Sequence, residues 1–179
     1  MLEKITKIEN IIIDLRYAGV NNICQKKLYF KDYAMLHQEA FDKLKVASEI
    51  ANKKKLKLKI WDAYRPLEIQ QYFYDFFSKD PNKQSFFSDP KTGSIPHCRG
   101  IAVDLTLTDE NNCQLEMGSD FDELSDLAHH NCLKISATAQ QNRVLLQEIM
   151  TASGFDFYSK EWWHYQLFNP RSYQILNFF

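Results

Sequence analysis

Apolar residues recur at helical spacing in three stretches of the chain, and each stretch predicts an amphipathic helix. The first is expected over residues 32–53, with Asp32 as its N-cap, because an aspartate side chain can accept hydrogen bonds from free amides of the first turn. The second is expected to start at Pro66, whose missing N–H costs nothing in a first helical turn. The third is expected over residues 138–153, and Gly154 provides its stop.

Alternation of apolar and polar residues predicts a different kind of element elsewhere. Strands are expected over residues 56–60, 101–108, 114–117, 155–158 and 162–168. A hairpin tip at 109–112 joins the second of these strands to the third, and the last two form a final hairpin. A short helix is expected over 121–130 and a long loop over 78–96, which contains three prolines. Because helices come first and antiparallel strands follow, the pattern favours an α+β fold, an antiparallel sheet with flanking helices.

Composition agrees with one domain spanning residues 1–179. A chain of 179 residues that is 45% hydrophobic is long enough to bury a sizeable core, and it contains no repeat or low-complexity linker. Its net charge of -1 gives no electrostatic footprint for nucleic acid or an anionic membrane surface. No apolar run approaches the ~18 residues of a membrane span, and the first ten residues are polar, so a cytoplasmic location is expected, with a periplasmic one as the alternative for a processed form. The sequence does not predict an oligomeric state, and a homodimer is one of the states that it allows.

The four cysteines (Cys24, Cys98, Cys113 and Cys132) form no CxxC pair. The sequence therefore indicates neither a zinc ribbon nor a redox motif, and we expect free thiols in a reducing compartment. Cys98 directly follows His97, so a thiolate ligand to a metal beside that histidine stays open as an alternative.

Two histidines and an aspartate give the chain its strongest chemical signal. Asp104 interrupts an apolar strand, where a carboxylate is costly unless it is paired or binds a metal. Together with His97 and His164 it makes an open three-ligand zinc set that leaves a fourth position for water. Glu161 precedes His164 by three residues and is the expected proton acceptor. An odd spacing points two strand residues to opposite faces, so Glu161 is expected in a turn or bulge before the strand.

Asp62 and Arg65 follow the first predicted strand. By alternation Asp62 shares the buried face of Leu58 and Ile60, and we expect it to hold the N–H of a zinc-bound histidine. Arg65, just before Pro66, is an always-charged donor suited to an oxyanion or a carboxylate.

These motifs resemble the VanX-type D-alanyl-D-alanine dipeptidases, zinc peptidases of the wider D,D-peptidase and hedgehog-like group. The resemblance is distributed over most of the chain. It is carried by DLRYA (14–18), DAYRP (62–66), HCRGIAVDLTL (97–107), MGSDFD (117–122), NRVLL (142–146) and EWWHYQL (161–167). Six segments in one order are far more specific than any one of them.

The resemblance implies one zinc ion per chain, with His97, Asp104 and His164 as its ligands. It implies Glu161 as the catalytic base and acid, and Arg65 as the group that stabilises the tetrahedral intermediate. It also implies a small α+β domain of the D,D-peptidase and hedgehog-like zinc peptidase type. The expected activity is hydrolysis of D-alanyl-D-alanine, or of a close D-amino-acid dipeptide, in the metabolism of peptidoglycan. A D,D-carboxypeptidase, and a zinc-binding module without catalysis, remain alternatives.

Substrate contacts follow from the same resemblance. By motif position, Asp122 and Tyr17 hold the ammonium of the dipeptide. The chain departs from the family two residues before His97, where the usual serine is replaced by Ile95, and Ser94 lies one residue further back. We carry the expected serine contact over to Ser94, and the exact dipeptide preference stays open.

Overall fold

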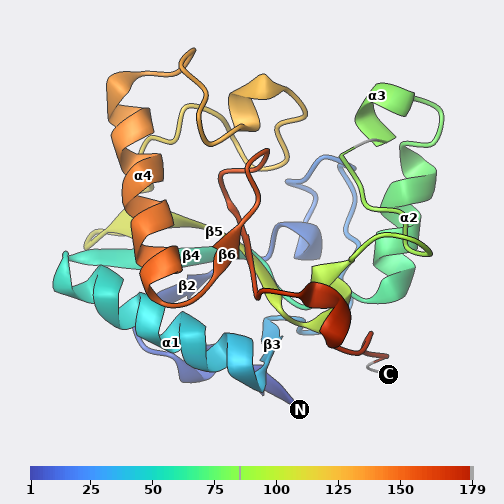
Figure 1. Cartoon of the computed structure of the whole chain (residues 1–179), viewed down its shortest axis with the longest axis horizontal. Helices are drawn as coiled ribbons and strands as arrows, with labels where there is room; N and C mark the ends of the chain where they lie inside the picture. Colours follow the sequence, from blue (N-terminus) through green and yellow to red (C-terminus); the bar gives the residue numbers. More distant parts are fainter. Residues whose placement is uncertain (85, 178–179) are drawn as a thin grey trace.

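A five-stranded sheet organises the fold in the computed structural model, which describes residues 1–84 and 86–177 (Figure 1). The strands lie in the order β2 (Ile11–Ile13), β4 (Leu56–Asp62), β5 (Ala102–Asp109), β7 (His164–Gln166) and β6 (Asp156–Phe157). A second sheet pairs β1 (Leu2–Lys4) with β3 (Met35–His37). The predicted α+β class is confirmed. The larger sheet is mixed, because β2 joins β4 in parallel while the other pairs are antiparallel.

The helices pack at two places around this sheet. α1 (Gln38–Lys53) contacts β4, and α4 (Ala137–Ala152) lies beside α1 (Figure 1). α2 (Leu67–Phe76) and α3 (Pro81–Gln84) lie at the opposite end of the molecule in this view. Short 3-10 turns complete the fold: η1 (Ile5–Lys7), η2 (Arg16–Ala18), η3 (Pro96–Arg99), η4 (Asp126–Ala128) and η5 (Pro170–Ser172).

The core explains why the predicted periodicities hold. Leu58 and Ile60 of β4 pair with Leu107 and Leu105 of β5, and all four side chains are fully buried. Leu44 of α1 is buried with them, as helical spacing predicts. Burying each of these side chains stabilises the fold by about 1.5–3 kcal/mol. No helix of the described residues has both the length and the apolar character needed to cross a bilayer.

Two helix starts differ from prediction. α1 begins at Gln38, and His37 is its N-cap, with Nδ1 accepting from the Glu39 amide at 3.4 Å. Asp32 instead accepts from the Ala34 amide, because pairing with β1 keeps the residues before α1 extended. α2 begins at Leu67, one residue later than predicted, and Pro66 is its N-cap, with an extended ψ of 147°.

Two further elements are smaller than predicted. The return strand expected over 114–117 is a single bridge between Thr108 and Gln114. The helix expected over 121–130 is only the turn η4. The long loop over 78–96 contains α3 and the start of η3, and residue 85 within it lies outside the described residues. Residues 178–179 of the expected domain lie outside them as well.

Candidate active site

The sheet register brings three polar side chains into one line across β4, β5 and β7. Asp62 pairs with Asp104, and Asp104 pairs with His164. Paired residues of neighbouring strands point to the same face. A register shift between Ile60 and Asp62 moves Asp62 to the face of Asp104, away from the face of Ile60. The prediction that Asp62 shares the face of Ile60 is wrong, because alternation cannot foresee this bulge.

His97 reaches the same line from the turn η3, directly before β5. The turn ends at Gly100, which has a left-handed φ of +67°. A Cβ at this position would lie 2.8 Å from Leu2 Cδ2, which can move, and 3.1 Å from the His37 backbone nitrogen, so the positive φ and the close backbone together favour glycine. The turn begins at Ile95, which also adopts a left-handed conformation, with φ of +40°. This conformation is rare for a β-branched residue.

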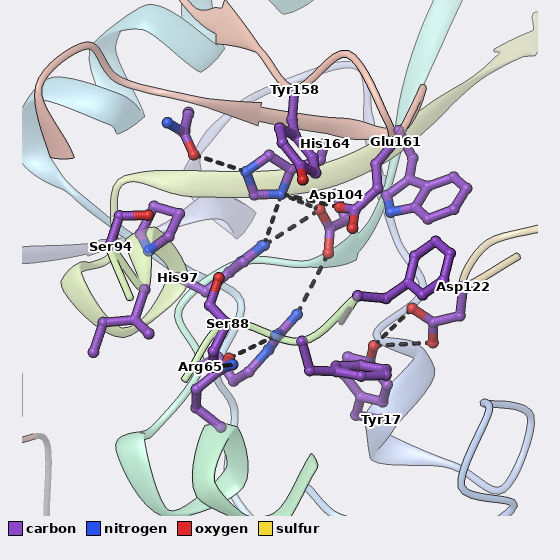
Figure 2. A pocket seen from close by; sticks show the side chains of 17 residues that line it. Tyr17, Arg65, Ser88, Ser94, His97, Asp104, Asp122, Tyr158, Glu161 and His164 are labelled. Carbon is purple, nitrogen blue, oxygen red and sulfur yellow. Dashed lines mark hydrogen bonds and ion pairs between the residues drawn. The ribbon is translucent and has the colours of Figure 1, made fainter. Parts of the chain in front are cut away.

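Three ligand atoms converge where these elements meet. Asp104 Oδ1 lies 3.0 Å from His164 Nδ1 and 3.3 Å from His97 Nε2, and the two nitrogens are 3.2 Å apart (Figure 2). Nitrogen and oxygen ligands of a tetrahedral zinc ion at about 2.0–2.1 Å stand about 3.3 Å from one another. All three side chains are buried. The group formed by His97, Asp104 and His164 therefore fits a metal ion in spacing and chemistry.

The opposite nitrogens of the two imidazoles are held by hydrogen bonds. His97 Nδ1 lies 2.8 Å from the Ala63 carbonyl oxygen, and His164 Nε2 lies 3.0 Å from Gln166 Oε1. Both acceptors require an N–H, which leaves the lone pairs of the converging nitrogens free for a metal. The Ala63 carbonyl takes the place expected for Asp62, whose Oδ2 lies 3.7 Å from His97 Nδ1.

Asp62 is instead the anchor of Arg65. Its Oδ2 accepts from Arg65 Nε at 2.8 Å and from Nη2 at 2.6 Å, and its Oδ1 accepts from Tyr29 Oη at 2.6 Å. Arg65 Nη1 donates to Gln70 Oε1 at 2.9 Å, and Nη2 lies 3.6 Å from Asp104 Oδ2. The guanidinium is thus fixed beside the metal-binding group, where it offers positive charge to an anionic oxygen.

Glu161 lies in the turn before β7, as its odd spacing from His164 predicts. Its amide donates to the Tyr158 carbonyl, and its carbonyl accepts from the His164 amide, so the residue stands off the strand. Glu161 Oε2 is 4.0 Å from His164 Nδ1. Burial raises the pKa of Glu161 to about 7, and the Asp104 carboxylate adds to the shift. A carboxyl group with such a pKa can accept and return a proton near neutral pH.

Asp122 and Tyr17 form a separate pair that lies beside Arg65, to its right in Figure 2. Tyr17 Oη lies 3.0 Å and 2.9 Å from the two carboxylate oxygens of Asp122. Among the described residues Asp122 has no cationic partner within ion-pair distance. Burial, with Asp104 nearby, raises its pKa to about 8. A carboxyl group in this state gains most from a cation brought by a ligand.

One cavity of about 320 Å³ connects these groups. Its lining includes the metal-binding group, Arg65, Glu161, Tyr17 and Asp122, together with Ser94, Ile95, Phe87, Ser88, Tyr158, Trp163 and Gln166. Figure 2 shows Ser94 and Asp122 on opposite sides of His97. Cys98 is buried and lies outside the metal-binding group, and the four cysteines are free thiols.

Comparison with known proteins assigns the chain to a family. The model of the peptidase M15 family, described as D-ala-D-ala dipeptidase, matches residues 3–178. The chain belongs to this family. It is 40% identical to a D-alanyl-D-alanine dipeptidase of Escherichia coli (strain K12) over 164 residues, covering 92% of this chain and 82% of that protein. It is 34% identical to one of Enterococcus faecium, covering 89% of each chain, and 28% identical to one of Streptomyces coelicolor, covering 89% and 87%.

As a member of the peptidase M15 family, the protein is a metallopeptidase, and its buried His97, Asp104 and His164 can hold the metal. Two hydrogen-bond acceptors of this M15 site were not predicted from the sequence. Gln166 shares a strand face with His164, so its spacing of two was a usable signal. The Ala63 carbonyl left no signal, because a backbone acceptor is independent of residue type.

Proposed function

We propose that the protein is a zinc-dependent dipeptidase that hydrolyses D-alanyl-D-alanine or a close D-amino-acid dipeptide. In this proposal residues 1–179 form one domain with one zinc ion, held by His97, Asp104 and His164. The observation that carries it is one cavity whose lining combines this group with Arg65, Glu161 and Asp122. The names of the aligned relatives support the substrate. The free thiols support a reducing compartment such as the cytoplasm.

Each residue of the site has a separate role in the proposed hydrolysis. Zinc in this site would polarise the scissile carbonyl and lower the pKa of a water molecule. Glu161 takes a proton from the attacking water and returns it to the nitrogen of the leaving amine as the C–N bond breaks. Arg65 donates to the carbonyl oxygen as that oxygen gains negative charge, and Asp62 and Gln70 hold it in place.

The charged end of the cavity sets which peptides fit. Asp122, supported by Tyr17, binds the ammonium of the dipeptide, and Ser94 contacts the substrate on the opposite side. An internal residue of a longer peptide has no ammonium to offer, so Asp122 would remain without a counterion. The site therefore favours free dipeptides over the ends of longer chains.

We expect the free amino group to control kcat/KM. D-alanyl-D-alanine should be cleaved faster than propionyl-D-alanine, which has the same skeleton without the amino group, and faster than a pentapeptide ending in D-Ala-D-Ala. A charge-assisted hydrogen bond contributes about 1.5–3 kcal/mol, so Asp122→Asn should lower kcat/KM for the dipeptide by roughly 10–100-fold. The same variant should leave the low rate with propionyl-D-alanine nearly unchanged. Steady-state kinetics with the three substrates measure both effects.

Two outcomes of this panel would contradict the proposal. Faster cleavage of the pentapeptide than of the dipeptide would indicate a D,D-carboxypeptidase. An equal loss with the dipeptide and with propionyl-D-alanine in Asp122→Asn would show that Asp122 does not bind the ammonium.

A further inference from the structure

Arg143 of α4 has a buried guanidinium group that takes no part in the proposed hydrolysis. Its side chain is 1% exposed. Nε donates to the Met117 carbonyl at 2.6 Å, Nη1 to the His129 carbonyl at 2.8 Å, and Nη2 to the Leu127 carbonyl at 2.8 Å. Nη2 also donates to Ser119 Oγ at 3.1 Å. All four acceptors belong to the segment of residues 117–129.

Backbone carbonyl groups, and not a carboxylate of the described residues, surround the positive charge of Arg143. Within residues 1–84 and 86–177, no carboxylate forms an ion pair with Arg143. Backbone carbonyl dipoles surround the charge, and the guanidinium lies over the Trp162 ring, 5.3 Å from its centre. Burial lowers the pKa of Arg143 only to about 10, so the group remains charged at neutral pH. A buried charge without a counterion is costly and persists where its hydrogen bonds fix a structure.

The bonds of Arg143 close the 117–129 segment into a loop. Met117 stands at its start, and Leu127 and His129 stand at its end, so one planar group joins both ends. Asp122 lies between them in a left-handed conformation, with φ of +60°, and its carboxylate lines the cavity. The segment contains only the short turn η4, so its shape depends on such cross-links.

The same group couples the loop to the turn that carries Glu161. Ser119 Oγ, which accepts from Arg143, also accepts from Trp162 Nε1 at 2.9 Å. The Trp162 amide donates to the Ala128 carbonyl at 3.0 Å. Trp162 directly follows Glu161, so these hydrogen bonds link Arg143 and the 117–129 segment to the turn that carries Glu161.

We propose that Arg143 is a positioning residue that holds Asp122 at the end of the cavity and thereby sets the preference for substrates with a free amino group. The inference rests on the proposed function, in which Asp122 binds the ammonium. Lysine keeps the charge, but its three N–H donors share one nitrogen, whereas Arg143 reaches Met117, His129 and Leu127 with three separate nitrogens. A planar fork with several donors is what this loop requires.

The test compares Arg143→Lys with the unchanged enzyme on two substrates, D-alanyl-D-alanine and propionyl-D-alanine. The measured quantity is the ratio of their kcat/KM values. We expect Arg143→Lys to lower this ratio roughly tenfold, through a higher KM for the dipeptide, with kcat within about threefold and zinc content unchanged. In an Asp122→Asn background the same substitution should not lower the ratio further.

A matched control is Arg99→Lys. Arg99 also donates to two backbone carbonyls, those of Ser94 and Tyr173, but it lies on the turn η3, outside the 117–129 segment. Its substitution should change kcat/KM for both substrates by the same factor. If Arg143→Lys does not fold, Ser119→Ala removes one acceptor of Arg143 and should lower the ratio by a smaller factor, about threefold.

The outcomes separate this inference from the proposed function. If Arg143→Lys, or Ser119→Ala in its place, lowers kcat/KM equally for both substrates, Arg143 has a merely structural role and the inference is wrong. If Asp122→Asn itself leaves the ratio unchanged, Asp122 does not bind the ammonium, and that result contradicts the proposed function and not only the role of Arg143. A lowered ratio in both Asp122→Asn and Arg143→Lys supports the proposed ammonium site and the positioning role of Arg143.

Discussion

Replacing Glu161 by glutamine is expected to lower kcat for D-alanyl-D-alanine by about 10²–10⁴-fold, the range that general acid–base catalysis contributes. Glutamine keeps the size of the side chain but cannot take a proton from water. Glu161 lies outside the group of His97, Asp104 and His164 that can hold the metal, so zinc content should stay at one ion per chain. Kinetics and metal analysis of the same preparation test both statements.

The control for this variant is Glu148→Gln. It makes the same chemical change at an exposed position of α4, outside the cavity, and should leave kcat unchanged. Retained turnover in Glu161→Gln at full zinc content would contradict its role as the base. Loss of zinc together with activity would show that Glu161 helps to hold the metal.

Replacing Arg65 by lysine is expected to lower kcat by about 10²–10³-fold, the loss typical of removing one donor to a developing oxyanion. The guanidinium binds Asp62 with two nitrogens and Gln70 with a third while Nη2 also faces Asp104. A lysine ammonium keeps the charge, so the buried Asp62 retains a counterion, but it cannot occupy these positions together. The fall should appear in kcat rather than in KM, because the charge on the oxygen develops only in the transition state.

Arg171→Lys serves as the control, since Arg171 is exposed and donates to the Thr92 carbonyl. Thermal unfolding of Arg65→Lys checks that the loss of rate is not a loss of folded protein. A higher KM with an unchanged kcat would contradict the proposed role, because it would mean that Arg65 contributes equally to the ground state and the transition state.

Long periodic stretches of the sequence predicted the elements that frame the site. β4, β5, α1 and α4 were all predicted, and their predicted ends agree with the structure to within two residues, apart from the start of α1. The strands β1, β2 and β3 have three residues each, which is too short for a periodicity. Their conformation comes from pairing with distant partners, so local sequence could not reveal them. The parallel pairing of β2 with β4 follows from the same long-range contact.

Residue types revealed the chemistry of the site better than its geometry. A carboxylate in an apolar strand and an odd spacing before His164 placed Asp104 and Glu161 where the structure has them. Asp62 was predicted to accept the N–H of a zinc-bound histidine. The bulge before Asp62 changes the face of the sheet to which its side chain points, and the carboxylate accepts from Arg65 instead. Arg143 belongs to the NRVLL motif, but its role could not be predicted, because its acceptors include backbone carbonyls that any sequence possesses.

The most direct test of the central claim is a zinc titration of the metal-free protein, with hydrolysis of D-alanyl-D-alanine as the readout. Free D-alanine is measured as zinc is added stepwise. The rate should be absent without metal, rise in proportion to bound zinc, and reach a plateau at one equivalent per chain. A substantial rate in the metal-free protein, or no D-alanine released at one full equivalent of bound zinc, would contradict a zinc dipeptidase.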